Sequence, residues 1–327
     1  MGSLTYADRL TSTYVDHVMK AKPYLSLQLR TFAPVEPDSW DPLIEQAIAA
    51  DRAGIGKIVV SDHIVFGEDL DAYADPDLGG ISGGKQPTGP DGSWLDPLTV
   101  LSVIAAVTTT VRLGTNILLA ALRRPAALAK SVATLDVLSG GRVDLGVGVG
   151  WQKEEYEACG LDFSSRGRQL DHTLEVCQLL WADQVADYES PELSFSAIHA
   201  MPKPIQKPGV PIWVGGTVNK RSMTRLAKFG SGWIPWGPDA SDIFGGIEAM
   251  RAAVASFGRD PSTIDVVGTL PVSRQGNQID LTATMESVPK MVDAGVTDFR
   301  TYLPIPQEVD EATEYLSDVV QRFNSVL

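Results

Sequence analysis

A histidine beside an aspartate follows a short apolar run in the first quarter of the chain. Residues 58–60 are apolar and lead directly into Ser61-Asp62-His63, so these polar residues stand where a buried strand would end. An imidazole there can donate or accept a proton near neutral pH, and a neighbouring carboxylate can set its protonation. The pattern indicates His63 and Asp62 as candidate catalytic residues, with a hydrogen-bonded structural histidine as the alternative.

Two glycine-containing segments could accommodate a ligand. Glycines alternate with apolar residues over residues 145–151, which removes side chains from one face and lets a flat ligand or another backbone approach closely. Gly215-Gly216-Thr217 precedes a helix-like segment with Lys220, Arg221 and Arg225, and backbone N–H groups at a helix N-terminus attract phosphate. Tight barrel packing and an ordinary strand-to-helix loop are the alternatives.

Several other kinds of site are not expected. No His, Cys, Asp or Glu grouping has the spacing of a metal site, and the sequence contains no Walker motif. With 27 Lys+Arg against 41 Asp+Glu, the net charge is −14, which disfavours nucleic acid and an anionic membrane surface as partners. No apolar stretch approaches the ~18 residues of a membrane-spanning helix. We therefore expect a small-molecule substrate.

The elements that must position these residues follow from the hydrophobic pattern. Apolar, β-rich runs alternate with amphipathic helical stretches along nearly the whole chain. We predict eight strands, at residues 24–32, 57–63, 111–121, 142–150, 211–216, 232–237, 264–272 and 298–305. Because each is followed by a helix, the pattern predicts an α/β fold, a single TIM (β/α)8 barrel. A doubly wound open sheet with a second domain is the alternative.

Two connections are too long for a simple strand-to-helix unit. Residues 64–95, after strand two, are rich in Gly and Pro, and residues 183–209, before strand five, contain Pro191, Pro202, Pro204 and Pro208. We expect both insertions to lie near the barrel mouth, at the C-terminal ends of the strands. A disordered surface loop is the alternative for the first insertion.

Helix ends and the chain's N-terminus give further expectations. Asp38 and Gly54 are expected to begin and end the first helix, and Pro125 to begin a later one. Residues 1–23 form a lead-in whose charged residues interrupt the apolar ones, unlike a secretory signal. Cys159 and Cys177 lack CxxC spacing, which fits a reducing cytoplasm. Residues 24–327 are expected to form one domain.

An ordered series of motifs lies within residues 112–181. It contains Arg-Pro before a helix, Thr-Leu-Asp before Ser-Gly-Gly-Arg, the glycine strand ending in Gly-Trp with Glu154-Glu155, an arginine-rich turn and Leu-Leu-Trp. With PKPIQKPGVPIWVGG and GSGWIP further on, these motifs resemble the luciferase-like monooxygenase superfamily, flavin and deazaflavin enzymes built on a TIM barrel. The resemblance covers about residues 24–305. Ser61-Asp62-His63 resembles the branch that uses the 8-hydroxy-5-deazaflavin coenzyme F420.

The resemblance implies a cofactor site at the barrel mouth. Asp62 and His63 would lie beside the deazaflavin ring, and Asn116-Ile117 would form a non-prolyl cis peptide behind it. The other implied cofactor-binding residues are Gly148, Val149, Gly150 and Trp151 along the tail, and Gly215, Gly216 and Thr217 at the phosphate. The sugar-phosphate dehydrogenases of this branch have a glutamate where this chain has Trp151, so a different substrate is expected. Phe32, Trp151 and Trp236 are candidates for an apolar substrate wall.

These expectations combine into one favoured function. It is a deazaflavin (F420)-dependent oxidoreductase that transfers a hydride between the coenzyme and a small organic substrate. His63 would donate or accept the matching proton, and Asp62 would orient His63 or bind the ring edge. The alternatives are an FMN-dependent two-component monooxygenase that uses molecular oxygen and a separate reductase, and a non-catalytic flavin-binding protein. The resemblance also implies a homodimer.

Overall fold

Eight parallel strands close into a barrel in the computed structural model, which describes residues 22–327. In chain order the strands are β1 (Tyr24–Gln28), β3 (Lys57–Val60), β5 (Arg112–Thr115), β6 (Val143–Val147), β9 (Ile212–Gly216), β10 (Gly232–Pro235), β11 (Asp265–Thr269) and β14 (Asp298–Thr301). Each pairs with the next, and β14 pairs with β1. The predicted TIM barrel is confirmed and the open sheet is excluded. Residues 1–21 of the expected lead-in lie outside the described residues.

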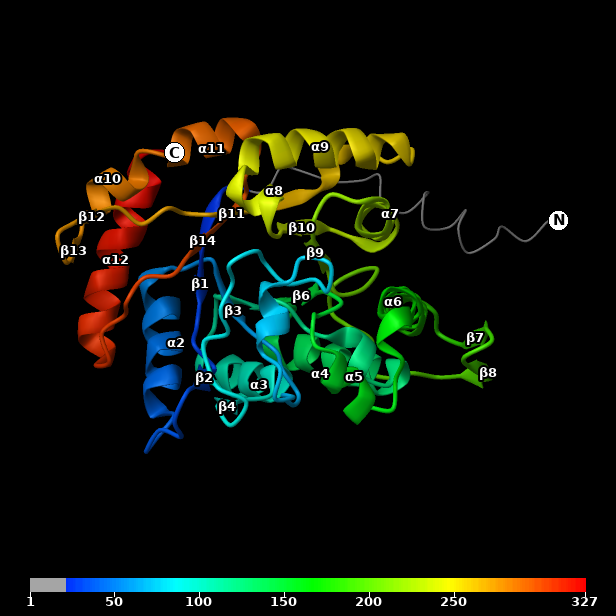
Figure 1. Ribbon diagram of the computed structural model, residues 1–327. Helices are drawn as coiled ribbons and strands as arrows, with labels where there is room; N and C mark the ends of the chain where they lie inside the picture. Colours follow the sequence, from blue (N-terminus) through cyan, green and yellow to red (C-terminus); the bar gives the residue numbers. More distant parts are fainter. Residues whose placement is uncertain (1–21) are drawn as a thin grey trace.

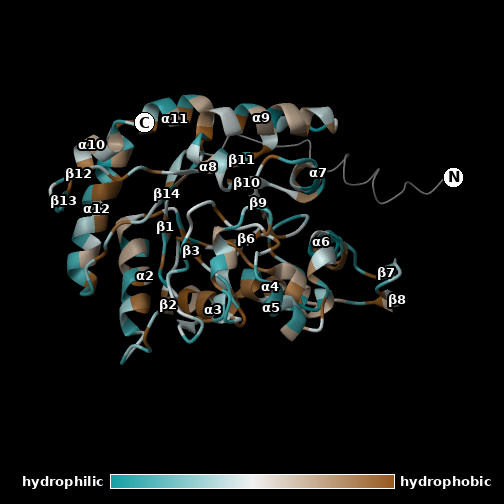
Figure 2. Cartoon of the chain, viewed as in Figure 1, coloured by the Kyte–Doolittle hydropathy of each residue, from teal (hydrophilic) through white to brown (hydrophobic). Residues whose placement is uncertain are grey.

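The helices form a ring around the strands (Figure 1). They are α2 (Asp41–Ala53), α3 (Pro97–Val107), α4 (Pro125–Ser139), α5 (Lys153–Ala158), α6 (Arg166–Ala182), α7 (Lys220–Phe229), α8 (Pro238–Ser241), α9 (Ile243–Ser256), α10 (Leu281–Met285), α11 (Val288–Ala294) and α12 (Val309–Ser325). Short 3-10 turns are η1 (Asp71–Ala74), η2 (Ala120–Leu122), η3 (Phe163–Ser165) and η4 (Pro261–Thr263). Hydrophobic residues run through the strands, α3 and α4 (Figure 2).

Local sequence explains where two of these helices begin and end. Pro125 begins α4, as predicted, because its missing N–H costs nothing in the first turn. Gly54 ends α2 in the left-handed conformation, with φ +83°, also as predicted. The prediction that Asp38 begins α2 is wrong. The helix starts at Asp41 after Trp40, with Pro in its first turn and without a side-chain cap.

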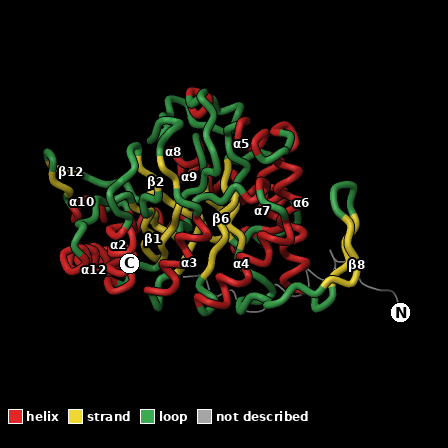
Figure 3. Tube along the Cα trace, turned by 90° about the horizontal axis from the view of Figure 1, so that it is seen from below, coloured by secondary structure: helices red, strands yellow, loops and turns green. Residues whose placement is uncertain are grey.

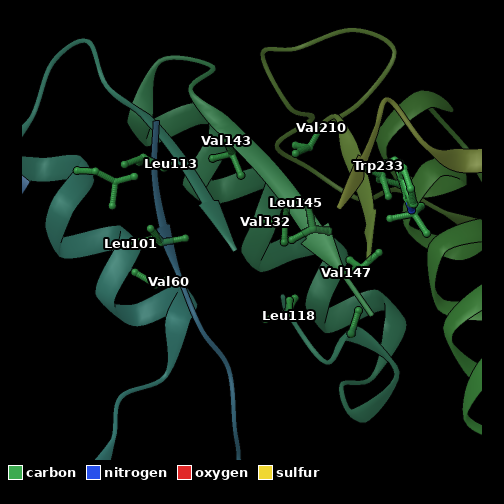
Figure 4. Close-up of a cluster of buried hydrophobic side chains, with 14 of the residues drawn as sticks. Val60, Leu101, Leu113, Leu118, Val132, Val143, Leu145, Val147, Val210 and Trp233 are labelled. Atoms are coloured by element: carbon green, nitrogen blue, oxygen red, sulfur yellow. The ribbon is translucent and has the colours of Figure 1, made fainter. Parts of the chain in front are cut away.

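The main hydrophobic core lies between the strands and the helices. Figure 4 shows part of it, where Leu101 and Val132 from α3 and α4 face the barrel strands. The barrel interior holds a second, small apolar cluster of Trp213, Ile234 and Val267, with Ile117 packed against it. Ile117 thus extends the apolar part of the lumen toward the C-terminal ends of the strands.

The opposite end of the lumen is filled by buried charges. Lys57 Nζ lies 2.9 Å from Asp144 Oδ2 and 3.1 Å from Asp298 Oδ2, and it lies 3.6 Å from the centroid of the Trp213 ring. Burial opposes ionisation of the two carboxyl groups and is the largest single influence on each. The combined effect of Lys57 with Arg112 at Asp144, and of Lys57 with Arg300 and Ser26 at Asp298, outweighs it, so the pKa of each carboxyl group is lowered. Since these residues lie at or near the starts of their strands, this network closes the N-terminal end of the barrel.

The second insertion does not lie near the mouth, and that prediction is wrong. Residues 183–209 contain a hairpin of β7 (Ala186–Glu189) and β8 (Ser194–Ile198), which projects beside α6 (Figure 3). Gln206 Nε2 donates to the carbonyl of Val143, the first residue of β6, at 2.7 Å. The physical reason is chain direction, because α6 returns the chain to the N-terminal ends of the strands before β9 begins.

Candidate functional site

His63 lies just beyond the C-terminal end of β3, in contact with two polar side chains from elsewhere in the chain. Its Nδ1 lies 3.1 Å from Oε2 of Glu155, in the first turn of α5, and its Nε2 lies 3.3 Å from Nε2 of Gln86. Glu155 is fully buried, and its Oε1 accepts the N–H of Ile64 at 2.8 Å. Sequence reasoning assigned no role to Glu155 or Gln86; the only signal was the acidic pair after the glycine strand.

Asp62 has a different partner from the one expected. Arg123 donates to both of its oxygens, from Nη1 to Oδ2 at 2.6 Å and from Nη2 to Oδ1 at 3.0 Å. Asp62 Oδ2 also accepts the N–H of Leu119 at 2.8 Å. The expectation that Asp62 orients His63 is corrected, since Glu155 holds that position. Asp62 instead anchors the segment that follows β5.

Aromatic rings surround His63. The centroids of Phe66, Trp94 and Trp151 lie 4.5, 4.8 and 6.0 Å from that of the imidazole. Phe32 stacks on Trp94 at 4.3 Å, where β2 (Phe32–Ala33) pairs with β4 (Ser93–Trp94). Two of the three residues predicted for an apolar wall, Phe32 and Trp151, therefore lie in the cluster around the histidine.

The residues after β5 occupy the centre of the mouth. The Asn116–Ile117 peptide is cis, as the resemblance implied. Asn116 Nδ2 donates to Gln28 Oε1 at 2.9 Å, and Gln28 Nε2 donates to Ser61 Oγ at 3.1 Å. This chain of hydrogen bonds joins the C-terminal ends of β5, β1 and β3 and leaves the Ile117 side chain beside the lumen.

Two glycines that follow β6, and one in β9, make room for this same segment. A methyl group on Gly148 would overlap Ile117 Cδ1, and one on Gly150 would lie 2.9 Å from Leu119 Cδ2. A methyl group on Gly215 would lie 3.0 Å from Ile117 Cγ2. Of the two possibilities left open by the sequence, the structure therefore shows the chain's own residues packed against these glycines. Ile117 becomes the apolar surface that a ligand at the mouth would meet.

The Gly215-Gly216-Thr217 turn leads into α7, and two of the helix's first N–H groups are already satisfied. Asn219 Oδ1 accepts from the N–H groups of Arg221 and Ser222 at 3.0 and 3.1 Å. Asp239 Oδ2 accepts the N–H of Val218 at 2.7 Å. The bare helix N-terminus is thus a weaker anion site than the sequence suggested.

Two arginines add positive charge near this turn. Burial lowers the pKa of the Arg166 guanidinium at the start of α6, and the nearby charge of Arg221 on α7 lowers it further. Arg166 Nε is buried without a hydrogen-bond partner. Two neighbouring guanidinium groups, one of them with an unused donor, are suited to binding a phosphate group. Sequence reasoning assigned no role to Arg166, because its proximity to Arg221 arises only in the folded chain.

The first insertion covers part of the mouth, as predicted. The light-blue segment crosses in front of the barrel in Figure 1. Arg166 Nη2 donates to the carbonyl of Leu78 at 3.2 Å, and Trp236 Nε1 donates to that of Gly80 at 3.2 Å. Tyr73 packs edge-on against Trp151, with ring centroids 5.4 Å apart. These contacts explain why a Gly- and Pro-rich segment is ordered there, and they place Trp236, the third predicted wall residue, under it.

Of the remaining predicted tail residues, Gly150 and Trp151 lie against this cover and Val149 contacts α5. Val149 O accepts the Tyr156 hydroxyl at 2.7 Å. A methyl group on Gly79 would lie 3.1 Å from the carbonyl oxygen of Gly150. Trp151 Nε1 is buried without a partner. An apolar side chain at the centre of the mouth, a cationic pair to one side and an unused buried donor fit a planar cofactor with an anionic tail.

Comparison with known proteins places this site in a family. Residues 25–288 match the family described as luciferase-like monooxygenase. The chain belongs to the luciferase-like monooxygenase family. Within residues 22–327, no group of His, Cys, Asp and Glu side chains is arranged to hold a metal ion. No helix of this luciferase-like protein, in the part that the structure describes, has the length and apolar character needed to cross a membrane.

Sequence relatives of this luciferase-like chain include proteins of mycobacteria. An uncharacterized protein of Mycobacterium bovis is 32% identical over 222 residues, which cover 68% of this chain and 74% of that protein. A phthiodiolone/phenolphthiodiolone dimycocerosates ketoreductase of Mycobacterium bovis is 30% identical over 207 residues, covering 62% of this chain and 54% of the relative. The family match, with an oxidoreductase among the relatives, makes this chain an enzyme of the luciferase-like superfamily.

Solved structures with the same fold include enzymes of two cofactor types. An F420-dependent secondary alcohol dehydrogenase, in complex with an F420–acetone adduct, has a TM-score of 0.70 at 16% identity, with 92% of this chain and 99% of that chain covered. The oxygenating constituent of 3,6-diketocamphane monooxygenase from Pseudomonas putida, in complex with FMN, has a TM-score of 0.70 at 13% identity, with 94% and 99% covered. At these identities the similarity is one of fold.

Proposed function

We propose that the chain is a coenzyme F420-dependent oxidoreductase that transfers a hydride between the coenzyme and a small organic substrate. The observation that carries this proposal is His63, held at the barrel mouth by Glu155 and surrounded by aromatic rings. Hydride exchange with an alcohol or carbonyl compound needs a proton acceptor or donor at the substrate oxygen, and imidazole serves as both near neutral pH. The coenzyme, when bound, supplies the carbon that exchanges the hydride.

The other residues of the mouth would bind and orient the coenzyme. Ile117 offers an apolar face for the ring system, because the glycines around it leave it room beside the lumen. Arg166 and Arg221 would hold the anionic tail near the Gly215-Gly216-Thr217 turn. The aromatic rings and the 64–95 cover would exclude water from the reacting groups, which strengthens their electrostatic interactions.

An FMN-dependent monooxygenase is the second candidate. The arginine pair suits the FMN phosphate as well as the coenzyme F420 tail, and an FMN-bound oxygenase shares the fold. A separate reductase would then supply reduced FMN. That function does not require His63 to donate or accept a proton. The ketoreductase relative also supports hydride transfer over oxygen chemistry.

The experiment is an isothermal titration calorimetry measurement, in which the purified protein is titrated separately with oxidised coenzyme F420 and with FMN. The proposal expects binding of coenzyme F420 at micromolar Kd or tighter, and FMN at least about tenfold weaker. Arg166→Gln should weaken binding at least about tenfold, since a hydrogen bond to a charged group contributes about 1.5–3 kcal/mol. Arg168→Gln, on the exposed side of the same helix, is the matched control.

The outcome separates the candidates. Micromolar FMN binding with no measurable coenzyme F420 binding overturns the proposal in favour of the monooxygenase. Binding of either cofactor without any turnover of alcohols or carbonyl compounds overturns the proposed alcohol and carbonyl chemistry. We also propose that the enzyme is a homodimer, which light scattering of the same sample tests.

A further inference from the structure

The contacts of His63 indicate in which form its ring meets a substrate. We propose that Glu155 is a positioning residue that keeps the His63 proton on Nδ1, so that Nε2 presents its lone pair to the hydroxyl group of an alcohol substrate. The substrate part of this inference rests on the proposed hydride-transfer function. The part about the imidazole stands on the geometry of this chain alone.

Glu155 leaves only one arrangement for the Nδ1 proton. Its carboxylate is fully buried, with Oε2 3.1 Å from His63 Nδ1 and Oε1 accepting the N–H of Ile64 at 2.8 Å. An ionised carboxylate only accepts hydrogen bonds. A bare Nδ1 would therefore place two acceptors against each other in a buried position, which costs the desolvation of both. The proton on Nδ1 removes that conflict.

The other ring nitrogen is then an acceptor. In a neutral imidazole with Nδ1 protonated, Nε2 carries the lone pair. Gln86 Nε2, a donor, lies 3.3 Å from it, and Gln86 is itself buried. The Gln86 amide thus occupies the position that a substrate O–H would take. A substrate hydroxyl reaching Nε2 replaces this long hydrogen bond with one of its own.

The chemistry at this position balances for alcohol oxidation. In this reaction the hydroxyl proton would pass to His63 Nε2 as the C–O single bond becomes a carbonyl, and oxidised coenzyme F420, when bound, would accept the hydride from the carbinol carbon. The substrate is oxidised by two electrons and the coenzyme is reduced by the same two. In the reverse direction the protonated ring donates to the carbonyl oxygen. Phe66 and Trp94, whose centroids lie 4.5 and 4.8 Å from the ring, favour alcohols with apolar substituents.

The first test needs no cofactor. The protein is labelled with ¹⁵N-histidine, and the ring nitrogens are observed by long-range ¹H–¹⁵N correlation at mildly alkaline pH. His63→Gln identifies the His63 signals, and His172, whose Nδ1 lies 3.0 Å from Tyr188 Oη, is an internal reference. The expected result is a protonated Nδ1 and an unprotonated Nε2. A proton on Nε2 in the wild-type protein, alone or together with one on Nδ1, overturns the proposal.

A pair of neighbouring variants provides the second test. Glu155→Gln has one acceptor oxygen for two donors, so the share of the Nδ1-protonated form should fall. Oxidation of secondary alcohols by the loaded enzyme should drop about 10²- to 10⁴-fold, the usual contribution of a placed base. Glu154→Gln removes a charge from the same helix turn and should leave both readouts within about twofold. An unchanged tautomer ratio in folded Glu155→Gln contradicts the positioning role.

The two levels of the proposal fail separately. If the wild-type protein binds no coenzyme F420 but shows the expected tautomer, the proposed function is wrong and the role of Glu155 stands. If it binds and turns over the coenzyme but carries the proton on Nε2, the proposed function stands and this inference is wrong. Far-UV circular dichroism of each variant establishes that it is folded.

Discussion

Replacement of Asp62 by asparagine should destabilise the protein rather than impair one chemical step. The Asp62 carboxylate is 1% exposed and accepts two hydrogen bonds from Arg123, whose side chain is 16% exposed. Removing one partner of a buried ion pair costs about 3–5 kcal/mol, because the other charge stays buried. Arg123 keeps Asp96 at 3.0 Å, which offsets part of this loss. We therefore expect the free energy of unfolding to fall by roughly 2–3 kcal/mol.

Urea denaturation followed by circular dichroism measures this change. Asp96→Asn is the matched control, since it removes the half-exposed partner of the same arginine and asparagine still caps α3. That control should cost about 1 kcal/mol or less. His63→Gln should change stability little. A free energy of unfolding for Asp62→Asn within about 0.5 kcal/mol of wild type would refute the structural role given to Asp62.

Three further predictions concern other parts of the fold. Burial raises the pKa of Asp51, but hydrogen bonds from the loop before β5 outweigh it and lower the value from 3.8 to about 2. The contribution of ionised Asp51 to the stability of the fold is present above pH 3.8 and is lost as pH falls toward 2. Discounted for exposure, this contribution is about 1 kcal/mol. Acid denaturation of Asp51→Asn should therefore lack this pH-dependent loss of stability. Burial raises the pKa of the Cys177 thiol, so iodoacetamide should label Cys177 only in denaturant, whereas it should label the partly exposed Cys159 in the native protein. Equal labelling rates of the two cysteines in the native protein would argue against the burial of Cys177. Gly148→Ala should cost about 1–3 kcal/mol in urea denaturation by overlapping Ile117, and Ile117→Val should restore part of the loss in the double variant, whereas independent effects would contradict that contact.

The barrel could be predicted because each strand is an apolar run of the right length between helical stretches. The runs at 57–63 and 142–150 each contain an observed strand, β3 and β6. The predicted ranges extend too far at their C-terminal ends, because the polar and glycine residues after each strand belong to the mouth. The cis Asn116–Ile117 peptide was expected only from the family resemblance, as nothing in local propensity indicates it.

The partners of the site residues could not be predicted in the same way. Adjacent residues at the end of a strand point to opposite sides, so Asp62 turns to Arg123 while His63 turns to Glu155. Glu155 lies 92 residues further along the chain, and only the closed barrel brings it to His63. The proximity of Arg166 to Arg221 depends on tertiary structure in the same way.

The central claim is that the mouth beside His63 binds a deazaflavin, and the cofactor that the protein retains in a cell tests it most directly. The chain would be expressed in a host that makes both coenzyme F420 and FMN, purified without added cofactor and denatured to release its chromophore. Absorption and fluorescence of the released compound identify it. We predict coenzyme F420 in the wild-type protein and a much smaller amount in Arg166→Gln. Release of FMN alone, in amounts matching the protein, would contradict the account.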